Sequence, residues 1–178
     1  NDSTELQPTS IAPEKKKLIK LLVNFLQEIG LTVKYATEEE PGFLPGLHIK
    51  NGGLSIDPEK ILYPGDILHE AGHLATLPGH IRCELNGTLP DTDMHRGAEL
   101  TTLAWSYAAA LHLKIPASVV FHEDGYKGAS QNLIDNFEQG RPIGLHMLQY
   151  HGMSYDEKNA ERLGIKPFPH MVSWLNLK

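Results

Sequence analysis

The sequence predicts an α+β fold that is mostly helical and contains a small antiparallel sheet. Apolar residues recur at three- and four-residue intervals over residues 13–29, which is the pattern of an amphipathic helix. Asn51 and Gly52 separate two short apolar stretches, and this dipeptide is a strong signal for a β-hairpin. An alanine-rich stretch over residues 94–113 favours a long helix. These three features together indicate several helices and a small sheet.

The chain divides into a polar tail at residues 1–12 and a single domain at residues 13–178. Its 178 residues match the size of one ordinary domain. Pro13 stands where proline is favoured in the first turn of a helix, and Gly30 stands where glycine ends one. The first predicted helix therefore fills most of the stretch between these two residues.

Three short strands are expected after this helix. The stretch 31–36 (LTVKYA) has the composition of a strand. The hairpin signal joins the stretches 47–50 (LHIK) and 54–57 (LSID). We therefore expect a small antiparallel sheet that precedes the next helix.

Helices make up most of the remaining chain. A central helix is expected to begin near Ile67, with Asp66 as its N-cap, and to stop at Pro78-Gly79. The alanine-rich helix follows, and Pro116 closes that segment. The shorter expected segments are a helical or extended piece with a glycine-rich loop at 119–130, helices at 130–140 and 143–152, and a loop-rich tail that contains a strand or short helix.

Composition argues against two classes of partner. The formal net charge is −6, whereas a nucleic-acid-binding surface needs a basic field. No apolar run approaches the roughly 18–20 residues of a membrane span. Cys83 is the single cysteine, so it cannot form an internal disulfide, and we expect it to be a buried apolar side chain. These features favour a cytoplasmic protein; a leader removed before Asn1 is the alternative.

The sequence HEAGH at residues 69–73 is the main functional signal. Within a helix, His69 and His73 project side by side, so both imidazoles can meet one zinc ion. Glu70 lies beside them, where it can take a proton from a water held by the metal. Gly72 leaves room for another backbone to approach this helix. A chance pair of structural histidines is the alternative interpretation.

A third protein ligand is expected, because two histidines do not hold zinc firmly. Glu99 is the preferred candidate, since a carboxylate in an otherwise apolar helix needs a cation or several donors. Gly97 is expected to let that helix come close to its neighbour. The alternative is that Glu99 faces solvent and that His80, His95 or Glu84 is the ligand.

The HEAGH stretch followed by Glu99 on a later helix resembles the zincin superfamily of metallopeptidases, in its glutamate-liganded (gluzincin) branch. The resemblance covers residues 45–113, and the whole chain is similar to small bacterial HEAGH proteins. It implies Zn2+ bound by His69, His73 and Glu99, with Glu70 as the general base. It also implies a zincin-like fold, in which the small antiparallel sheet packs beside the HEAGH helix. The interval between His73 and Glu99 is longer than in the common members.

A zinc peptidase also needs a group that stabilises the oxyanion formed at the attacked carbonyl. The stretch FHEDGYKG at residues 121–128 supplies His122 and Tyr126 as catalytic candidates. Either side chain can reach over the metal from a loop. A solvated loop without a catalytic role is the alternative.

These patterns predict a zinc-dependent hydrolase, and specifically a metallopeptidase whose peptide or protein substrate lies along an exposed sheet edge. The first alternative is a non-catalytic metal-binding or interaction module with a structural zinc, in which His80 or His95 is the fourth ligand. The second is hydrolysis of a non-peptide amide or ester, because the same chemistry attacks any activated carbonyl. The sequence indicates no particular oligomeric state.

Overall fold

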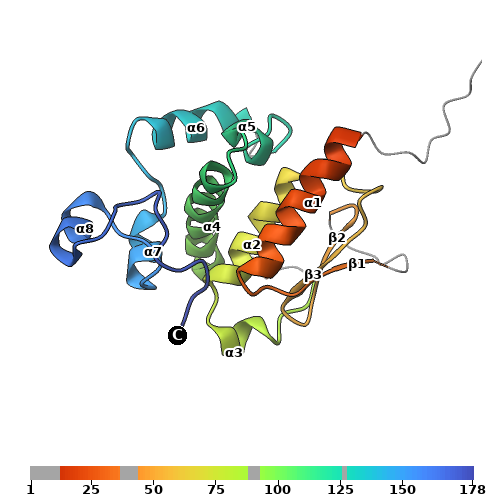
Figure 1. The fold of residues 1–178 in the computed structure, drawn as a ribbon, viewed down its shortest axis with the longest axis horizontal. Coiled ribbons are helices and arrows are strands. Elements are labelled where there is room, and N and C mark those ends of the chain that lie inside the picture. Colours follow the sequence, from red (N-terminus) through yellow and green to blue (C-terminus); the bar gives the residue numbers. More distant parts are fainter. Residues whose placement is uncertain (1–12, 37–43, 88–92, 126–127) are drawn as a thin grey trace, which may run out of the picture.

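The computed structural model describes residues 13–36, 44–87, 93–125 and 128–178, with the backbone alone for residues 93–96. The fold is α+β and mostly helical, as predicted (Figure 1). The strands are β1 (Val33–Tyr35), β2 (Leu47–Lys50) and β3 (Gly53–Ile56). The helices are α1 (Pro13–Glu28), α2 (Gly65–Thr76), α3 (Gly79–Arg82), α4 (Asp93–His112), α5 (Ala117–Val120), α6 (Ser130–Glu138), α7 (Leu145–Tyr150) and α8 (Glu157–Leu163). The predicted polar tail at residues 1–12 lies outside the described residues.

The sheet is mixed, so the prediction of an antiparallel sheet is wrong for one of its strands. Its strand order is β1-β3-β2. The β2–β3 hairpin is antiparallel as predicted, and its turn residues Asn51 and Gly52 have φ of 49° and 77°, which a tight two-residue turn requires. However, β1 pairs in parallel with β3, the last strand along the chain. Alternating apolar residues identify a strand but carry no information about the direction of its partner.

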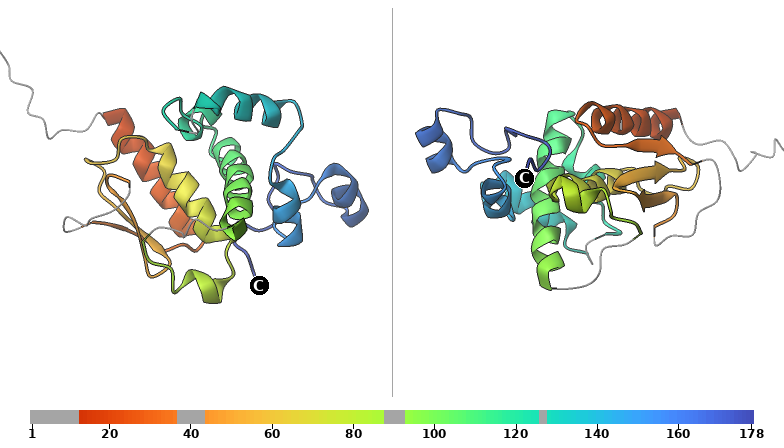
Figure 2. Two further views of the ribbon diagram at one scale, coloured as in Figure 1. Left: turned by 180° about the vertical axis from the view of Figure 1, so that it is seen from behind. Right: turned by 90° about the horizontal axis from the view of Figure 1, so that it is seen from below.

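Helix α2 occupies the centre of the molecule, between α1 and α4 (Figures 1 and 2). The sheet flanks α1 and α2, and its apolar side chains Leu54 and Ile56 are buried in the core they share with these helices. α7 lies on the opposite side of α4, whereas α5 contacts both α2 and α4 and is followed by α6. The central position of α2 explains why nine of its twelve residues are buried.

The two ends of α2 differ in detail from the prediction. The helix begins at Gly65, with Pro64 at the N-cap position, so Asp66 belongs to the first turn and does not cap the helix. At the other end, the Arg82 guanidinium donates hydrogen bonds of 2.7 Å to the Leu74 carbonyl and 2.9 Å to the Leu77 carbonyl. A cation is favourable here because the last carbonyls of a helix lack partners within it.

The C-terminal segment also closes over the end of α2. The backbone N–H of Asn176 donates to the Ala75 carbonyl at 2.8 Å, and the Asn176 side-chain amide donates to the Thr76 carbonyl at 2.9 Å. The Trp105 indole donates to the Trp174 carbonyl at 3.0 Å. The chain end and α4 therefore hold α2 from two sides.

Helices α2 and α4 touch closely at Gly72, as predicted. A Cβ atom on Gly72 would overlap the Thr102 hydroxyl and lie 3.1 Å from the Trp105 ring. The same Thr102 hydroxyl donates to the His69 carbonyl at 2.7 Å. The corresponding prediction for Gly97 is wrong, because a Cβ there has no neighbour within 4 Å among the described residues. Of these two glycines, Gly72 is the one that lies at the close contact between the helices.

Replacing Gly72 with Ala should lower the free energy of unfolding by about 1–3 kcal/mol, because the added methyl must push α4 away. Gly97→Ala is the matched control: it adds the same methyl to a helix interior in open space, and should raise stability by roughly 0.5–1 kcal/mol. Urea unfolding followed by circular dichroism measures both changes. Equal effects of the two substitutions would contradict the close contact at Gly72.

Two expectations from composition can be compared with the structure. Cys83 is exposed beside the end of α3, so the prediction that it is buried is wrong. Cys83 lies in a connection at the surface, and the residues beside it in the sequence do not indicate whether this connection is buried or exposed. None of the helices in the described part of the chain combines the length and apolar character needed to cross a membrane.

Candidate metal centre

The two histidines of α2 and the glutamate of α4 meet where these helices face each other. His69 Nε2 lies 2.9 Å from Glu99 Oε1, and His73 Nε2 lies 2.8 Å from Glu99 Oε2. The two imidazole rings are 5.0 Å apart and inclined at 82°. One possible ligand atom from each residue lies within 4.8 Å of the others. The structure therefore brings together the three residues that the sequence predicts as metal ligands.

The charges of these three groups depend on one another. Burial alone would raise the pKa of Glu99, but the hydrogen bonds from His69 and His73 outweigh it and hold that pKa well below its usual range. Burial alone would lower the pKa of His69, but its hydrogen bond to Glu99 and the charge of that carboxylate raise it. Glu99 is thus an anion that both imidazoles share.

The donor set fits a zinc ion in type and number. Two imidazole nitrogens and one carboxylate oxygen make up a three-ligand set found in catalytic zinc sites. Both Nε2 atoms are directed at the same carboxylate, which places them close enough to share one cation. One usual feature is missing: His73 Nδ1 is buried without a hydrogen-bond partner in the described part of the chain, whereas a ligating histidine commonly donates from that nitrogen.

Glu99 is more exposed than the argument that predicted it as a ligand assumed. Its side chain is 46% exposed, so it does not lie within the apolar core. Leu103 and Ala104, one turn further along α4, are buried. Glu99 occupies the rim of the helix interface, where the cleft opens to solvent.

A cleft of about 580 Å³ opens beside the three residues. Its lining is of two chemical kinds. The polar and charged residues and one glycine are His69, Glu70, Glu99, Asp66, His122, Asp124 and Gly125. The mainly apolar residues are Leu44, Pro45, Leu47, Ile61, Leu62 and Tyr63. A substrate in this cleft would contact both kinds of side chain.

Glu70 lines the cleft next to His69 and is half-buried. Burial raises the pKa of Glu70; the nearby imidazoles of His69 and His73 partly oppose this, and the Glu99 charge adds to it. Glu70 makes no ion pair with a lysine or arginine of the described chain. Its carboxyl group therefore lies in the cleft and is not neutralised by a lysine or arginine of the described residues.

His122 follows α5 and lines the same cleft. Three contacts fix its ring. His122 Nε2 lies 2.8 Å from Asp66 Oδ1, and the Tyr63 ring stacks on it with centroids 3.9 Å apart. On Gly125, a Cβ would lie 3.1 Å from His122 Cε1. The Tyr63 hydroxyl donates to Asp124, so the stacked ring is itself held in place.

No family model, curated protein or solved structure matches this chain. The description of the site accordingly depends on the geometry of its own residues. The group of His69, His73 and Glu99, the position of Glu70 and the fixed His122 ring are the observations available for a functional interpretation.

The other candidate ligands are not part of this group. His80 on α3 and Glu84 after it are both exposed and lie outside the cluster of possible ligand atoms. His95 belongs to the first turn of α4, but its side chain is not among those described. The second catalytic candidate, Tyr126, also lies outside the described residues.

Two residues of the cleft were not predicted from the sequence as site residues. Asp66 was expected to cap α2, but its carboxylate pairs with His122. Tyr63 was given no role, but it stacks on the same ring. Both partners are more than 50 positions away in the sequence, and no local pattern indicates such pairs.

Proposed function

We propose that this protein is a zinc-dependent hydrolase, and specifically a metallopeptidase with a zincin-like site of the glutamate-liganded type. The observation that carries the proposal is the convergence of His69 and His73 on the Glu99 carboxylate, with Glu70 in the adjoining cleft. His69, His73 and Glu99 would hold Zn2+. When bound, zinc would lower the pKa of a water molecule and polarise the carbonyl to be attacked.

The chain's own residues supply the remaining steps. The Glu70 carboxylate takes a proton from the attacking water, and the resulting carboxyl group returns it to the leaving nitrogen. His122 is the candidate donor to the oxyanion that forms on the former carbonyl; because its Nε2 contacts Asp66 and its Nδ1 is buried, the ring would have to leave Asp66 in order to donate. In the structure, the Asp66 carboxylate fixes the orientation of this ring.

A peptide substrate fits the arrangement of the sheet. β2 is an edge strand, and its first residue, Leu47, lines the cleft. The amide of Gly87 already donates to the Ile49 carbonyl, so the hairpin end of this edge is covered. At the other end the Leu47 amide donates to the Leu44 carbonyl at 3.3 Å, so an extended peptide that follows this edge would lie against Leu44 and Leu47, which both line the cleft, with its carbonyl toward the metal.

Cleavage of a mixed peptide pool by the full-length chain, followed by mass spectrometry, tests the proposal. The zinc-loaded protein should cleave peptides, the EDTA-treated protein should not, and added zinc should restore cleavage. Stoichiometric zinc binding without cleavage of any peptide would contradict the proposal. Parallel assays with an amide and an ester of a small carboxylic acid test the non-peptide alternative.

One observation favours a second candidate, a structural zinc without turnover. The three possible ligands join α2 to α4, and an ion there would fasten the two helices together. A closed structural site needs a fourth protein ligand. The exposed position of His80, outside the cluster, counts against this candidate.

A further inference from the structure

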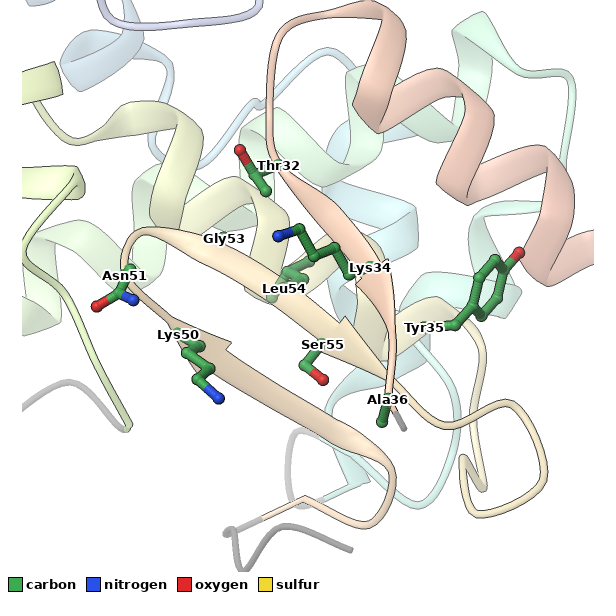
Figure 3. A pocket seen from close by; sticks show the side chains of 9 residues that line it. All are labelled: Thr32, Lys34, Tyr35, Ala36, Lys50, Asn51, Gly53, Leu54 and Ser55. Carbon is green, nitrogen blue, oxygen red and sulfur yellow. The ribbon is translucent and has the colours of Figure 1, made fainter. Parts of the chain in front are cut away.

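A second hollow lies on the sheet, on the face turned away from the core (Figure 3). Its volume is about 310 Å³. The residues that line it are Thr32, Lys34, Tyr35, Ala36, Lys50, Asn51, Gly53, Leu54 and Ser55. It shares none of these with the cleft beside the histidines. An inference about this hollow is therefore independent of the proposed hydrolase.

The strand register places polar side chains together on this outer face. Lys34 on β1 lies directly opposite Ser55 on β3. Lys50 on β2 lies opposite Gly53, two residues before Ser55 and on the same face. Figure 3 shows the two lysines on either side of β3, with the Ser55 hydroxyl exposed between the strands. Three groups able to donate hydrogen bonds thus surround one hollow.

Gly53 lines the hollow where β3 lies close to the start of β1. A Cβ atom on Gly53 would lie 2.6 Å from the Thr32 carbonyl oxygen. Any side chain at this position would therefore displace Thr32, so the close approach of these two segments requires glycine.

The Ser55 hydroxyl makes no hydrogen bond within the described part of the chain. The residue as a whole is 9% exposed, and its hydroxyl is turned toward the hollow (Figure 3). Since Ser55 lines the hollow, a molecule bound there could accept this hydrogen bond.

The electrostatic character of the hollow is opposite to that of the whole protein. Among the described residues that line it, the charged ones are Lys34 and Lys50, whereas the chain carries a formal net charge of −6. Lys34 makes no ion pair with another described residue. A ligand of negative charge is therefore favoured at this place on an otherwise acidic protein.

We propose that this hollow binds the phosphate group of a small soluble molecule. Lys34 and Lys50 supply positive charge from two sides, and the Ser55 hydroxyl and the Asn51 side chain supply neutral donors. Donors on three sides of the hollow suit an anion with oxygens in several directions, as in phosphate, better than a planar carboxylate. The hollow is larger than one phosphate group, which leaves room for the molecule that carries it.

Isothermal titration of the full-length chain with phenyl phosphate tests this proposal. Phthalate serves as the carboxylate probe, since it is also a dianion on an aromatic ring. Phenyl phosphate should bind at one site and more tightly than phthalate. The affinity should be the same before and after EDTA treatment, because the hollow shares no residue with the histidine cleft.

Three variants locate the binding. Lys34→Met keeps the apolar stem but removes the charge, and should weaken phenyl phosphate binding about tenfold or more. Ser55→Ala should weaken binding severalfold without changing charge, and serves as the second variant if Lys34→Met does not fold. Lys166→Met is the matched control, because this exposed lysine lies far along the chain in the C-terminal segment, and it should bind as the natural chain does.

Several results would overturn the proposal. Failure of the natural chain to bind millimolar phenyl phosphate is one of them. Equal weakening by Lys34→Met and Lys166→Met would show attraction to overall charge only. Equal or tighter binding of phthalate would show that the hollow does not select phosphate, and loss of binding after EDTA treatment would place the ligand in the histidine cleft.

Discussion

Replacement of Glu70 by Gln should lower peptide hydrolysis roughly 10²–10⁴-fold, the range for loss of a general base. Gln has nearly the same shape as Glu, but its amide cannot take a proton from water. Zinc content and thermal stability should stay close to those of the natural chain, because Glu70 lines the cleft and is not one of the three clustered ligands. Steady-state cleavage of a peptide identified in the pool, together with zinc analysis, measures these effects.

Glu84→Gln is the matched control for this prediction. Glu84 is exposed and lies outside the cluster, so the same change of carboxylate to amide should leave cleavage unaltered. If Glu70→Gln instead removes both zinc and fold, Glu70 has a structural role and the mechanism is wrong. If activity survives the substitution, another residue is the base.

Replacement of Glu99 by Gln should weaken zinc binding by roughly a hundredfold or more, since even outer-shell partners contribute 10–100-fold. The substitution removes the negative charge and leaves a single acceptor oxygen where two now contact His69 and His73. The amide is also a poor zinc ligand. Competition with a chromophoric chelator measures the affinity, and cleavage at limiting zinc should fall in parallel.

His80→Ala is the control that separates the candidate third ligands. His80 is exposed on α3, so its loss should leave zinc affinity unchanged. A strong loss with His80→Ala together with unchanged affinity in Glu99→Gln would reverse the assignment. Unchanged affinity in both variants would mean that zinc, if it binds, binds elsewhere.

Local sequence patterns predicted most of the elements because those elements depend on local chemistry. The three- and four-residue periodicity that defines α1, the Asn51-Gly52 turn and the alanine-rich α4 all appear in the structure. Helix ends were predicted less well: α2 begins two residues before Ile67. Such boundaries depend on the packing of the first turn, which the sequence alone does not specify.

Contacts between distant segments could not be predicted in the same way. The parallel pairing of β1 with β3 is one example, and the pairing of Asp66 with His122 is another. The proximity of Glu99 to the histidines was predicted from one polar residue in an apolar helix, yet Glu99 lies at the rim of the cleft. The position was right although the assumed burial was wrong, because the contact at Gly72, 30 and 33 residues from its α4 partners Thr102 and Trp105, helps to set how the two helices dock.

That docking contact has a consequence for how an ion would leave the protein. The possible ligands are divided between two helices that meet at Gly72 and Thr102. Neither helix alone can offer the complete set, however intact its own turns remain. A bound cation should therefore be released when the two helices separate during gradual denaturation. If the helices separate before they unfold, release of the cation precedes the loss of the helical circular dichroism signal.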